Sequence, residues 1–232
     1  ALRLSKRESE MKAAGYDLPA IAKAAAANTL ANGGKDIMID KSLENELWLM
    51  FAWGDCGFNA NLVTLMSGLK DPRQPLYMGK NQGEFTTTDG TKVEKNSGYY
   101  GIRFASGLPG KPNNWGNLSS WVDKDNQKGI YTAPLPIFKQ AESYFLLAEA
   151  ALRGWTSGDV KSLYEEGIRV SMANELAYKG KYADIKEYAA NAVEDYINGT
   201  STQIDFVDPF DTKLNTRALN KLCVKWDNGA SK

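Results

Sequence analysis

Aromatic, amide and arginine side chains are concentrated in one stretch of this chain, residues 79–131. A sugar ring presents a flat C–H face that stacks on tyrosine and tryptophan, and its hydroxyl groups pair with amides and guanidinium groups. We interpret the set as a candidate oligosaccharide-binding surface. The alternative left open is that several of the rings form a small core inside the stretch. The candidate residues are Tyr99, Tyr100, Arg103, Asn113, Asn114, Trp115 and Trp121.

The same stretch is rich in glycine, asparagine, serine and threonine and is too long for an ordinary connection. Loops of this length are usually functional or disordered. A disordered segment carries few aromatic residues, whereas this one carries many. The sequence therefore predicts a folded but irregular, partly extended loop region.

Two carboxylates have a spacing that is relevant to glycoside hydrolysis. Glu142 and Glu149 are seven residues apart, which puts them on one helix face about 10 Å apart. Glycosidases use two carboxyl groups roughly 5 to 10 Å apart, one of them with a raised pKa. We favour a structural role for both glutamates, and we expect no catalytic residue and no enzyme activity.

The sequence offers no convincing metal or cofactor site. Histidine is absent, which removes the commonest ligand for zinc and the commonest general acid or base. The acidic run 123–129 alternates like a calcium loop, but Lys128 replaces the glycine and Pro134 replaces the bidentate glutamate. Cys56 and Cys223 form no metal or redox motif. We expect no cofactor and favour free thiols over a disulfide, which the sequence does not exclude.

Composition limits the class of protein. The 232 residues are 43% hydrophobic, enough for one sizeable core or two small ones. The 28 basic and 28 acidic residues give a formal charge of zero, so no basic field attracts nucleic acid. No apolar run approaches the roughly 18 residues of a membrane span, and no signal peptide is present. Because the chain starts with Ala1, we interpret it as a piece of a larger precursor.

Two antiparallel helices, predicted over 134–172, follow the aromatic stretch and would position it. Apolar residues recur at helical spacing in both halves. Pro134 and Pro136 fit a helix entry, Gly154 fits a left-handed end, and the 156–159 segment offers caps for the second helix. The two stripes are Ile137, Ala141, Tyr144, Phe145, Ala148 and Leu152, and then Val160, Leu163, Tyr164, Gly167, Ile168 and Ser171.

Further helices are expected on both sides of this pair. Helical periodicity with glycine or asparagine at the ends predicts them. The 35–56 segment is predicted to be extended, and the Asp-Pro-Arg-Gln-Pro segment from Asp71 is predicted to be a turn in which Pro75 prevents regular structure. The predicted helices cover residues 1–14, 19–31, 58–69, 182–197 and 214–226.

Four motifs in the same order resemble the SusD/RagB family, and in particular its SusD-like branch. The longest is PLPIFKQAESYFLLAEAALRGW together with the following helix, which is similar to the signature helix pair of the family. The other three are LRLSKR, KDPRQPLY and SGYYGIRFASGLPG. The resemblance implies a mainly α fold, with TPR-like helix pairs and a long irregular, partly extended loop region.

The resemblance also implies a function. It predicts a non-catalytic, surface-exposed lipoprotein of the cell outer membrane that binds oligosaccharides and delivers them to a TonB-dependent, SusC-like transporter. Membrane attachment would occur only through a lipid anchor that lies outside this sequence. The alternative is a RagB-like peptide-binding protein or a TPR-type protein-interaction module.

The resemblance further implies how the chain is organised. The lipid-bearing cysteine and the C-terminal signature of the family are missing, so we expect the chain to be truncated at both ends. We interpret residues 1–232 as one SusD-like domain fragment. Its expected parts are 1–69 (helices and short extended segments), 70–133 (loop region and candidate ligand surface), 134–198 (TPR-like helices) and 199–232 (C-terminal loop and short helix).

Overall fold

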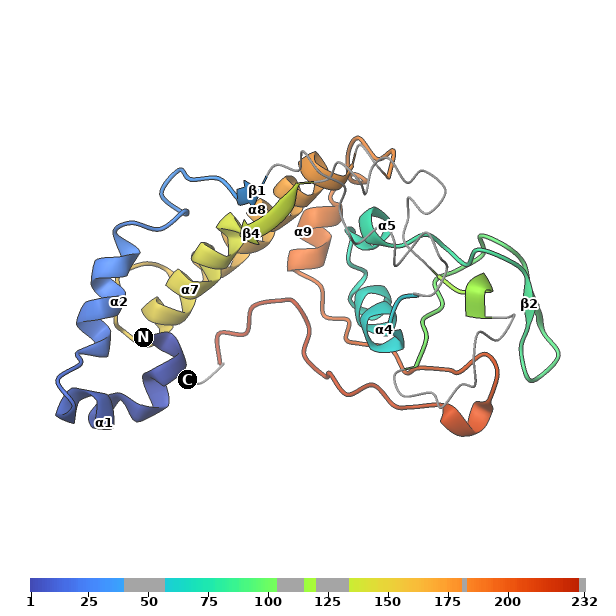
Figure 1. Ribbon diagram of the computed structural model, residues 1–232, viewed down its shortest axis with the longest axis horizontal. Coiled ribbons are helices and arrows are strands. Elements are labelled where there is room, and N and C mark those ends of the chain that lie inside the picture. The colour runs from blue at the N-terminus through green and yellow to red at the C-terminus, as the bar shows by residue number, and fades with distance from the viewer. Residues whose placement is uncertain (40–56, 104–114, 120–133, 181–182, 230–232) are drawn as a thin grey trace. The chain divides into compact units, whose positions relative to one another are not determined.

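A computed structural model describes residues 1–39, 57–103, 115–119, 134–180 and 183–229 of the chain (Figure 1). The chain divides into two compact units. Unit 1 comprises Ala1–Ile39, Pro134–Asn174 and Trp226–Lys232, and unit 2 comprises Asp40–Ala133 and Glu175–Lys225. Helices dominate the described residues and the strands are short, so the mainly α prediction is confirmed.

Unit 1 begins with three short helical elements. A 3-10 helix, η1 (Leu2–Arg7), leads into α1 (Glu8–Ala13), and α2 (Leu18–Ala26) follows. The Asp17 carboxylate accepts a hydrogen bond from the Ala20 amide at 3.0 Å and caps α2, with proline in its first turn. Both helices predicted for this region are therefore present, although α2 ends at Ala26, before the predicted end at residue 31.

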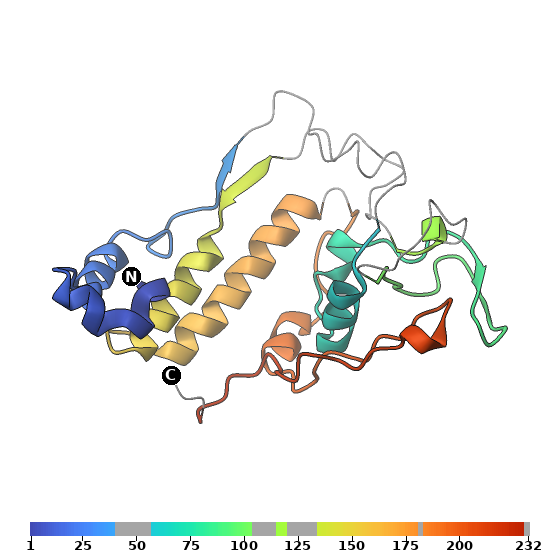
Figure 2. The same cartoon turned by 60° about the horizontal axis from the view of Figure 1, so that its bottom comes forward.

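The helix pair of unit 1 is α7 (Gln140–Leu152) and the first part of α8 (Val160–Lys179). Gly154 has φ +73° and ends α7, while Asp159 accepts a hydrogen bond from the Ser162 amide at 2.8 Å and caps α8. A Cβ on Gly167 would lie 2.8 Å from the Phe145 ring. The short connection makes the two helices antiparallel neighbours (Figure 2).

The entry to α7 differs from the prediction. Residues Leu135–Phe138 form strand β4, which pairs antiparallel with β1 (Ile37–Ile39), so prolines 134 and 136 do not open the helix. A residue before proline is biased towards extended backbone, which explains the strand. Asp36 instead accepts a hydrogen bond from the Gln140 amide at 2.8 Å. The α7 N-terminus is thus capped by a side chain 104 residues away.

Unit 2 is built around α4 (Ala60–Leu69), which Asn59 caps and left-handed Lys70 ends. Short helices α5 (Gln74–Tyr77) and α9 (Ala192–Ile197) belong to the same unit. Pro75 lies in the first turn of α5, where its missing N–H costs nothing, so the prediction that it prevents regular structure is wrong. The core combines Val63, Met66 and Met78 with partly buried Phe58, Tyr77 and Tyr99.

Two predicted helices of unit 2 are wrong in whole or in part. Of the helix expected over 182–197, α9 forms the last six residues, and 183–191 are turns and irregular backbone. The final helix expected over 214–226 is replaced by a 3-10 turn, η3 (Thr212–Leu214), and irregular backbone. Asp205 and Asn220 accept hydrogen bonds there from the Ala218 and Leu222 amides. Such side-chain contacts compete with helical hydrogen bonding.

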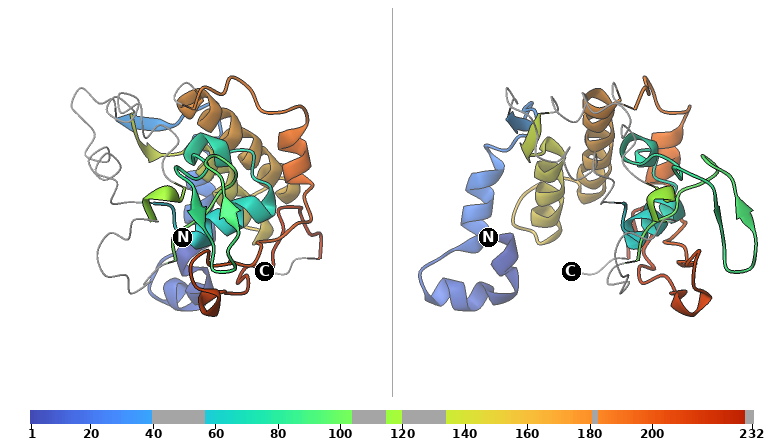
Figure 3. Two further views of the ribbon diagram at one scale, coloured as in Figure 1. Left: turned by 90° about the vertical axis from the view of Figure 1, so that its right-hand side faces the viewer. Right: turned by 45° about the vertical axis from the view of Figure 1, so that its right-hand side comes forward.

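The loop region contains a β-hairpin of β2 (Phe85–Thr86) and β3 (Lys92–Val93). The hairpin extends away from α4 and α5 (Figure 3). Among the described residues, no helix is both long and apolar enough to span a bilayer.

Candidate ligand-binding site

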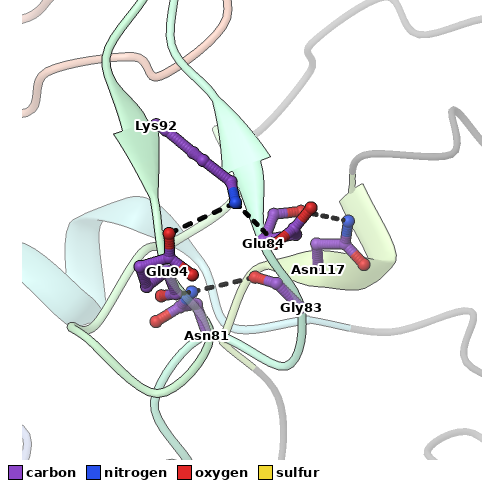
Figure 4. Close-up of polar contacts among 6 residues, drawn as sticks. All are labelled: Asn81, Gly83, Glu84, Lys92, Glu94 and Asn117. Carbon is purple, nitrogen blue, oxygen red and sulfur yellow. Dashed lines mark hydrogen bonds and ion pairs between the residues drawn. The ribbon is translucent and has the colours of Figure 1, made fainter.

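Asn81 organises the base of the hairpin. Its side chain is fully buried and its amide group donates hydrogen bonds to the carbonyls of Gly83 (2.9 Å) and Glu94 (2.8 Å). Its oxygen accepts from the backbone amides of Ser97 (2.9 Å) and Gly98 (3.1 Å). One side chain thereby joins both ends of the 81–98 segment (Figure 4).

The same hairpin holds the short 3-10 helix η2 (Trp115–Asn117). The Asn117 amide group donates a hydrogen bond to the Glu84 carbonyl at 2.8 Å, and the Gly83 amide donates to the Asn117 carbonyl at 3.3 Å (Figure 4). A Cβ on Gly83 would lie 2.6 Å from Asn117 Cγ, so a larger residue there would displace the Asn117 side chain. The short helix that begins with Trp115, a predicted sugar-binding residue, is therefore held to the hairpin through Asn117.

Tyr99 and Tyr100 take part in packing. Tyr99 packs against the Val63–Met66–Met78 cluster, and burial raises the pKa of its hydroxyl group. The Tyr100 ring meets Phe85 edge-on, with centroids 5.0 Å apart, and its backbone exchanges hydrogen bonds with Ser119. Both rings are only half-buried, so their role as ligand contacts stays a prediction.

Arg103 lines a cavity of about 180 Å³ in unit 2. The other walls come from the start of α4 (Asn59, Asn61, Thr64) and from the segments 203–206 and 216–219. The latter two segments are joined by an antiparallel bridge between Phe206 and Thr216. The cavity thus brings together three parts of the chain that are distant in sequence.

Glycines let the backbone segments around this cavity approach α4. A Cβ on Gly101 would lie 2.5 Å from Ala60 Cα, and one on Gly68 would lie 2.6 Å from the Ile204 amide nitrogen. The Ala60 amide also donates to the Ile102 carbonyl at 2.8 Å. In each of these contacts, main chain lies against main chain. The backbone segments that form the cavity walls are therefore held in place by the fold.

Gln203 ties the C-terminal wall of the cavity to α4. Its buried amide group donates to Asn61 Oδ1 at 2.7 Å and to Thr64 Oγ1 at 2.9 Å, while its oxygen accepts from the Asn220 amide at 3.0 Å. Buried polar groups that are hydrogen-bonded in this way have a fixed orientation. The polar lining of the cavity is therefore preorganised.

The predicted site residues divide into separate groups. Arg103 lies at the cavity, the two tyrosines contribute to packing, and Trp115 begins the short helix that Asn117 holds to the hairpin. Asn113, Asn114 and Trp121 lie outside the described residues. The sequence reasoning missed Gln203 and Arg217, because neither belongs to a local motif and both lie over 130 residues from α4.

The Asp-Pro-Arg segment forms a charged aromatic cluster. Arg73 binds Asp71 through two hydrogen bonds, of 2.9 and 2.6 Å, and its guanidinium lies 5.8 Å from the Tyr196 ring centroid. Burial, followed by the negative charge of Glu175, raises the pKa of Tyr77. Burial raises the pKa of Tyr196 to about 12. Neutral tyrosines and a paired arginine make this a structural cluster.

Comparisons with known proteins agree on the architecture. A susD homologue from Bacteroides thetaiotaomicron matches with a TM-score of 0.69 and 25% identity, over 97% of this chain and 42% of that one. A SusD-like protein from the same organism matches with a TM-score of 0.57 and 28% identity, over 81% and 34%. A chitin-binding SusD homologue from Flavobacterium johnsoniae matches with a TM-score of 0.61 and 24% identity, over 84% and 35%.

The fold is therefore that of the mainly α-helical SusD homologues. The chain spans less than half the length of these solved homologues. The family model described as SusD-like, Susd and RagB outer membrane lipoprotein, matches residues 1–232. The chain belongs to this family, as its four sequence motifs predicted. No curated protein sequence matches it significantly.

Proposed function

We propose that this protein binds oligosaccharides at the outer surface of the outer membrane, without cleaving them, and delivers them to a TonB-dependent, SusC-like transporter. The observation that carries the proposal is membership of an outer-membrane lipoprotein family along the whole chain. The chitin-binding homologue from Flavobacterium johnsoniae supports a carbohydrate ligand.

The loop region supplies suitable chemistry for such a ligand. The hairpin holds Asn117, two residues from Trp115, and Arg103 lines a cavity with fixed amide groups in the same unit. Aromatic rings and fixed amides are the groups that hold sugar faces and hydroxyl groups. We therefore assign ligand binding to this region.

A binding role also fits the two carboxylates with glycosidase-like spacing. Glu149 pairs with Arg153 one turn along α7, with Oε1 2.7 Å from Nη2. Glu142 lies in the first turn of α7, where a negative charge stabilises the helix dipole. Each glutamate thus has a structural reason for its position.

A titration with a panel of oligosaccharides tests the proposal. We expect saturable binding that quenches or shifts tryptophan fluorescence, and no release of new reducing ends. Trp115→Ala should weaken binding by about tenfold or more, which is typical of a central aromatic contact. Trp155→Ala is the matched control, because it removes one indole from unit 1 and should leave the affinity unchanged.

Two results would contradict this proposal. The first is the absence of a response to every oligosaccharide while a peptide library binds, which would favour the RagB-like alternative. The second is steady production of shorter sugars, which would identify an enzyme.

A further inference from the structure

The cavity of unit 2 is rich in hydrogen-bond donors and poor in acceptors. Asn59 Oδ1 already accepts from the Asn61 amide at 2.8 Å, and Asn61 Oδ1 accepts from Gln203. Within the described residues, neither asparagine Nδ2 group nor the Arg217 guanidinium has a hydrogen bond or ion pair. Among the described side chains of the cavity, these N–H donors are therefore free to meet a ligand.

The electrostatic character of the cavity is positive. Arg103 and Arg217 both line it, whereas none of the described residues that line it is acidic. The ten-residue helix α4 begins at its wall and adds the positive end of a helix dipole. The nearby carboxylate of Asp205 is engaged by the Ala218 amide at 2.8 Å and is not part of the lining.

The size of the cavity limits what it holds. Its volume of about 180 Å³ lies below the roughly 300 to 1,000 Å³ of pockets that bury a whole drug-sized ligand. One sugar residue or its substituent suits this volume, and an oligosaccharide does not. Phe206 on the wall adds an apolar surface for a ring face.

We propose that this cavity binds the carboxylate of an acidic sugar residue, such as a uronic acid, within the captured oligosaccharide. The carboxylate is acceptor-only and negatively charged, which complements fixed amide donors and a guanidinium fork. The inference rests on the proposed function, because it assumes that the protein binds an oligosaccharide. It adds that the ligand carries a negative charge and that this cavity is the subsite for it.

A matched ligand pair tests the subsite. Two oligosaccharides that differ only in a terminal glucuronate or glucose are titrated by calorimetry against the purified protein. We expect the glucuronate form to bind about tenfold more tightly or better, which corresponds to one charge-assisted contact. Arg217→Gln should abolish this difference. Lys221→Gln, which removes a positive charge from the same segment outside the cavity lining, should preserve it.

A second variant separates charge from folding. Asn61→Asp keeps an oxygen for Gln203 but replaces donors with a negative charge inside the cavity. It should reverse the preference, so that the glucose form binds more tightly than the glucuronate form, a result that loss of folding would not give. Equal affinities for both oligosaccharides in the unmodified protein would overturn the inference. Equal effects of Arg217→Gln and Lys221→Gln would overturn it as well.

Free ligands distinguish this inference from the proposed function. Glucuronate should shift the side-chain amide resonances of Asn61 and Gln203 in NMR spectra, and glucose should not. If no oligosaccharide binds but glucuronate gives these shifts, the proposed function fails and the cavity assignment stands. If sulfate or acetate gives the same shifts at the same concentration, the site is a general anion site, and the assignment to an acidic sugar is wrong.

Discussion

Arg73 and Asp71 form a largely buried ion pair in unit 2. Their side chains are 21% and 5% exposed, and the two groups meet with bidentate geometry. By contrast, Lys92 and Glu84 meet at 3.1 Å with side chains 58% and 63% exposed. One ion pair is shielded from solvent and the other is not, so comparing them shows how burial affects the contribution of an ion pair to stability.

We expect Asp71→Ala to lower the free energy of unfolding by about 3 kcal/mol, because it leaves a largely buried guanidinium without its carboxylate. Glu84→Ala should cost less than about 1 kcal/mol, since its pair is exposed and screened by water. Urea unfolding followed by circular dichroism measures both. Similar losses in the two variants would show that burial does not set the strength of these pairs.

The tyrosines around this pair predict an alkaline limit to stability. Burial, followed by the charge of Asp71, raises the pKa of Tyr196 from 10.0 to about 12. A raised folded-state pKa means that the native state holds the proton more tightly. The stabilisation is therefore complete below about pH 10 and is lost as pH rises towards about 12.

We expect the free energy of unfolding to fall over this window by as much as about 3 kcal/mol for two pKa units. Urea unfolding at a series of pH values measures the fall, and tyrosinate absorbance reports ionisation. Tyr196→Phe should flatten the curve, because it removes the titrating group. An unchanged slope in that variant would assign the alkaline loss to other residues.

At the scale of elements, glycine positions control how closely loops approach α4. Gly68 lies inside α4, and a Cβ there would lie 2.6 Å from the Ile204 nitrogen and 2.8 Å from Gln203 Cα. Both atoms are main chain, so the segment that carries Gln203 would have to move. This segment also forms one wall of the cavity.

We expect Gly68→Ala to destabilise the protein by about 1 to 2 kcal/mol. Overpacking costs roughly 1 to 3 kcal/mol, and better helix propensity returns up to about 1 kcal/mol. Gly116→Ala is the control, since a Cβ there meets nothing within 4 Å. Chemical denaturation measures both variants. A Gly68→Ala protein as stable as the parent would show that the 203 segment adapts without cost.

The strand β4 shows why element boundaries depend on long-range partners. The 134–139 segment has helix-compatible prolines and an apolar residue at the right spacing, and Ile137 is nevertheless 60% exposed in a strand. Pairing with β1 and the cap from Asp36 determine where α7 begins. Neither partner is visible within the local sequence window.

At the scale of the whole molecule, the proposed delivery of the ligand requires a partner in the membrane. These 232 residues carry no formal net charge, so they add little long-range attraction to association. We expect the tagged protein, extracted in mild detergent from outer membranes, to carry a TonB-dependent transporter, and the complex to survive moderate salt because it is not charge-driven. Mass spectrometry of the eluate identifies the transporter.

A different outer-membrane lipoprotein carrying the same tag is the control, and it should elute without that transporter. If the transporter is absent from both eluates while oligosaccharide binding is intact, delivery to a SusC-like partner is wrong and the binding role remains.

The sequence by itself determined the family and the helices whose ends are encoded locally. The capping residues lie within one turn of the helix that they begin or end, as Asp17, Gly154 and Asp159 show. Their role can therefore be recognised from the local sequence. Order along the chain was also enough to recognise the four family motifs, and hence the mainly α fold.

Only the tertiary structure determined where the cavity forms and which of the predicted helices are absent. Asn61 and Gln203 form a hydrogen bond although they are 142 residues apart. In the 214–226 segment, backbone amides bond to side chains and no helix forms, despite the helical pattern of its sequence. Such partners meet only when the chain has folded, because their interaction depends on distance in space. The cavity beside α4, with its arginines and amide donors, exists only because these distant segments pack together.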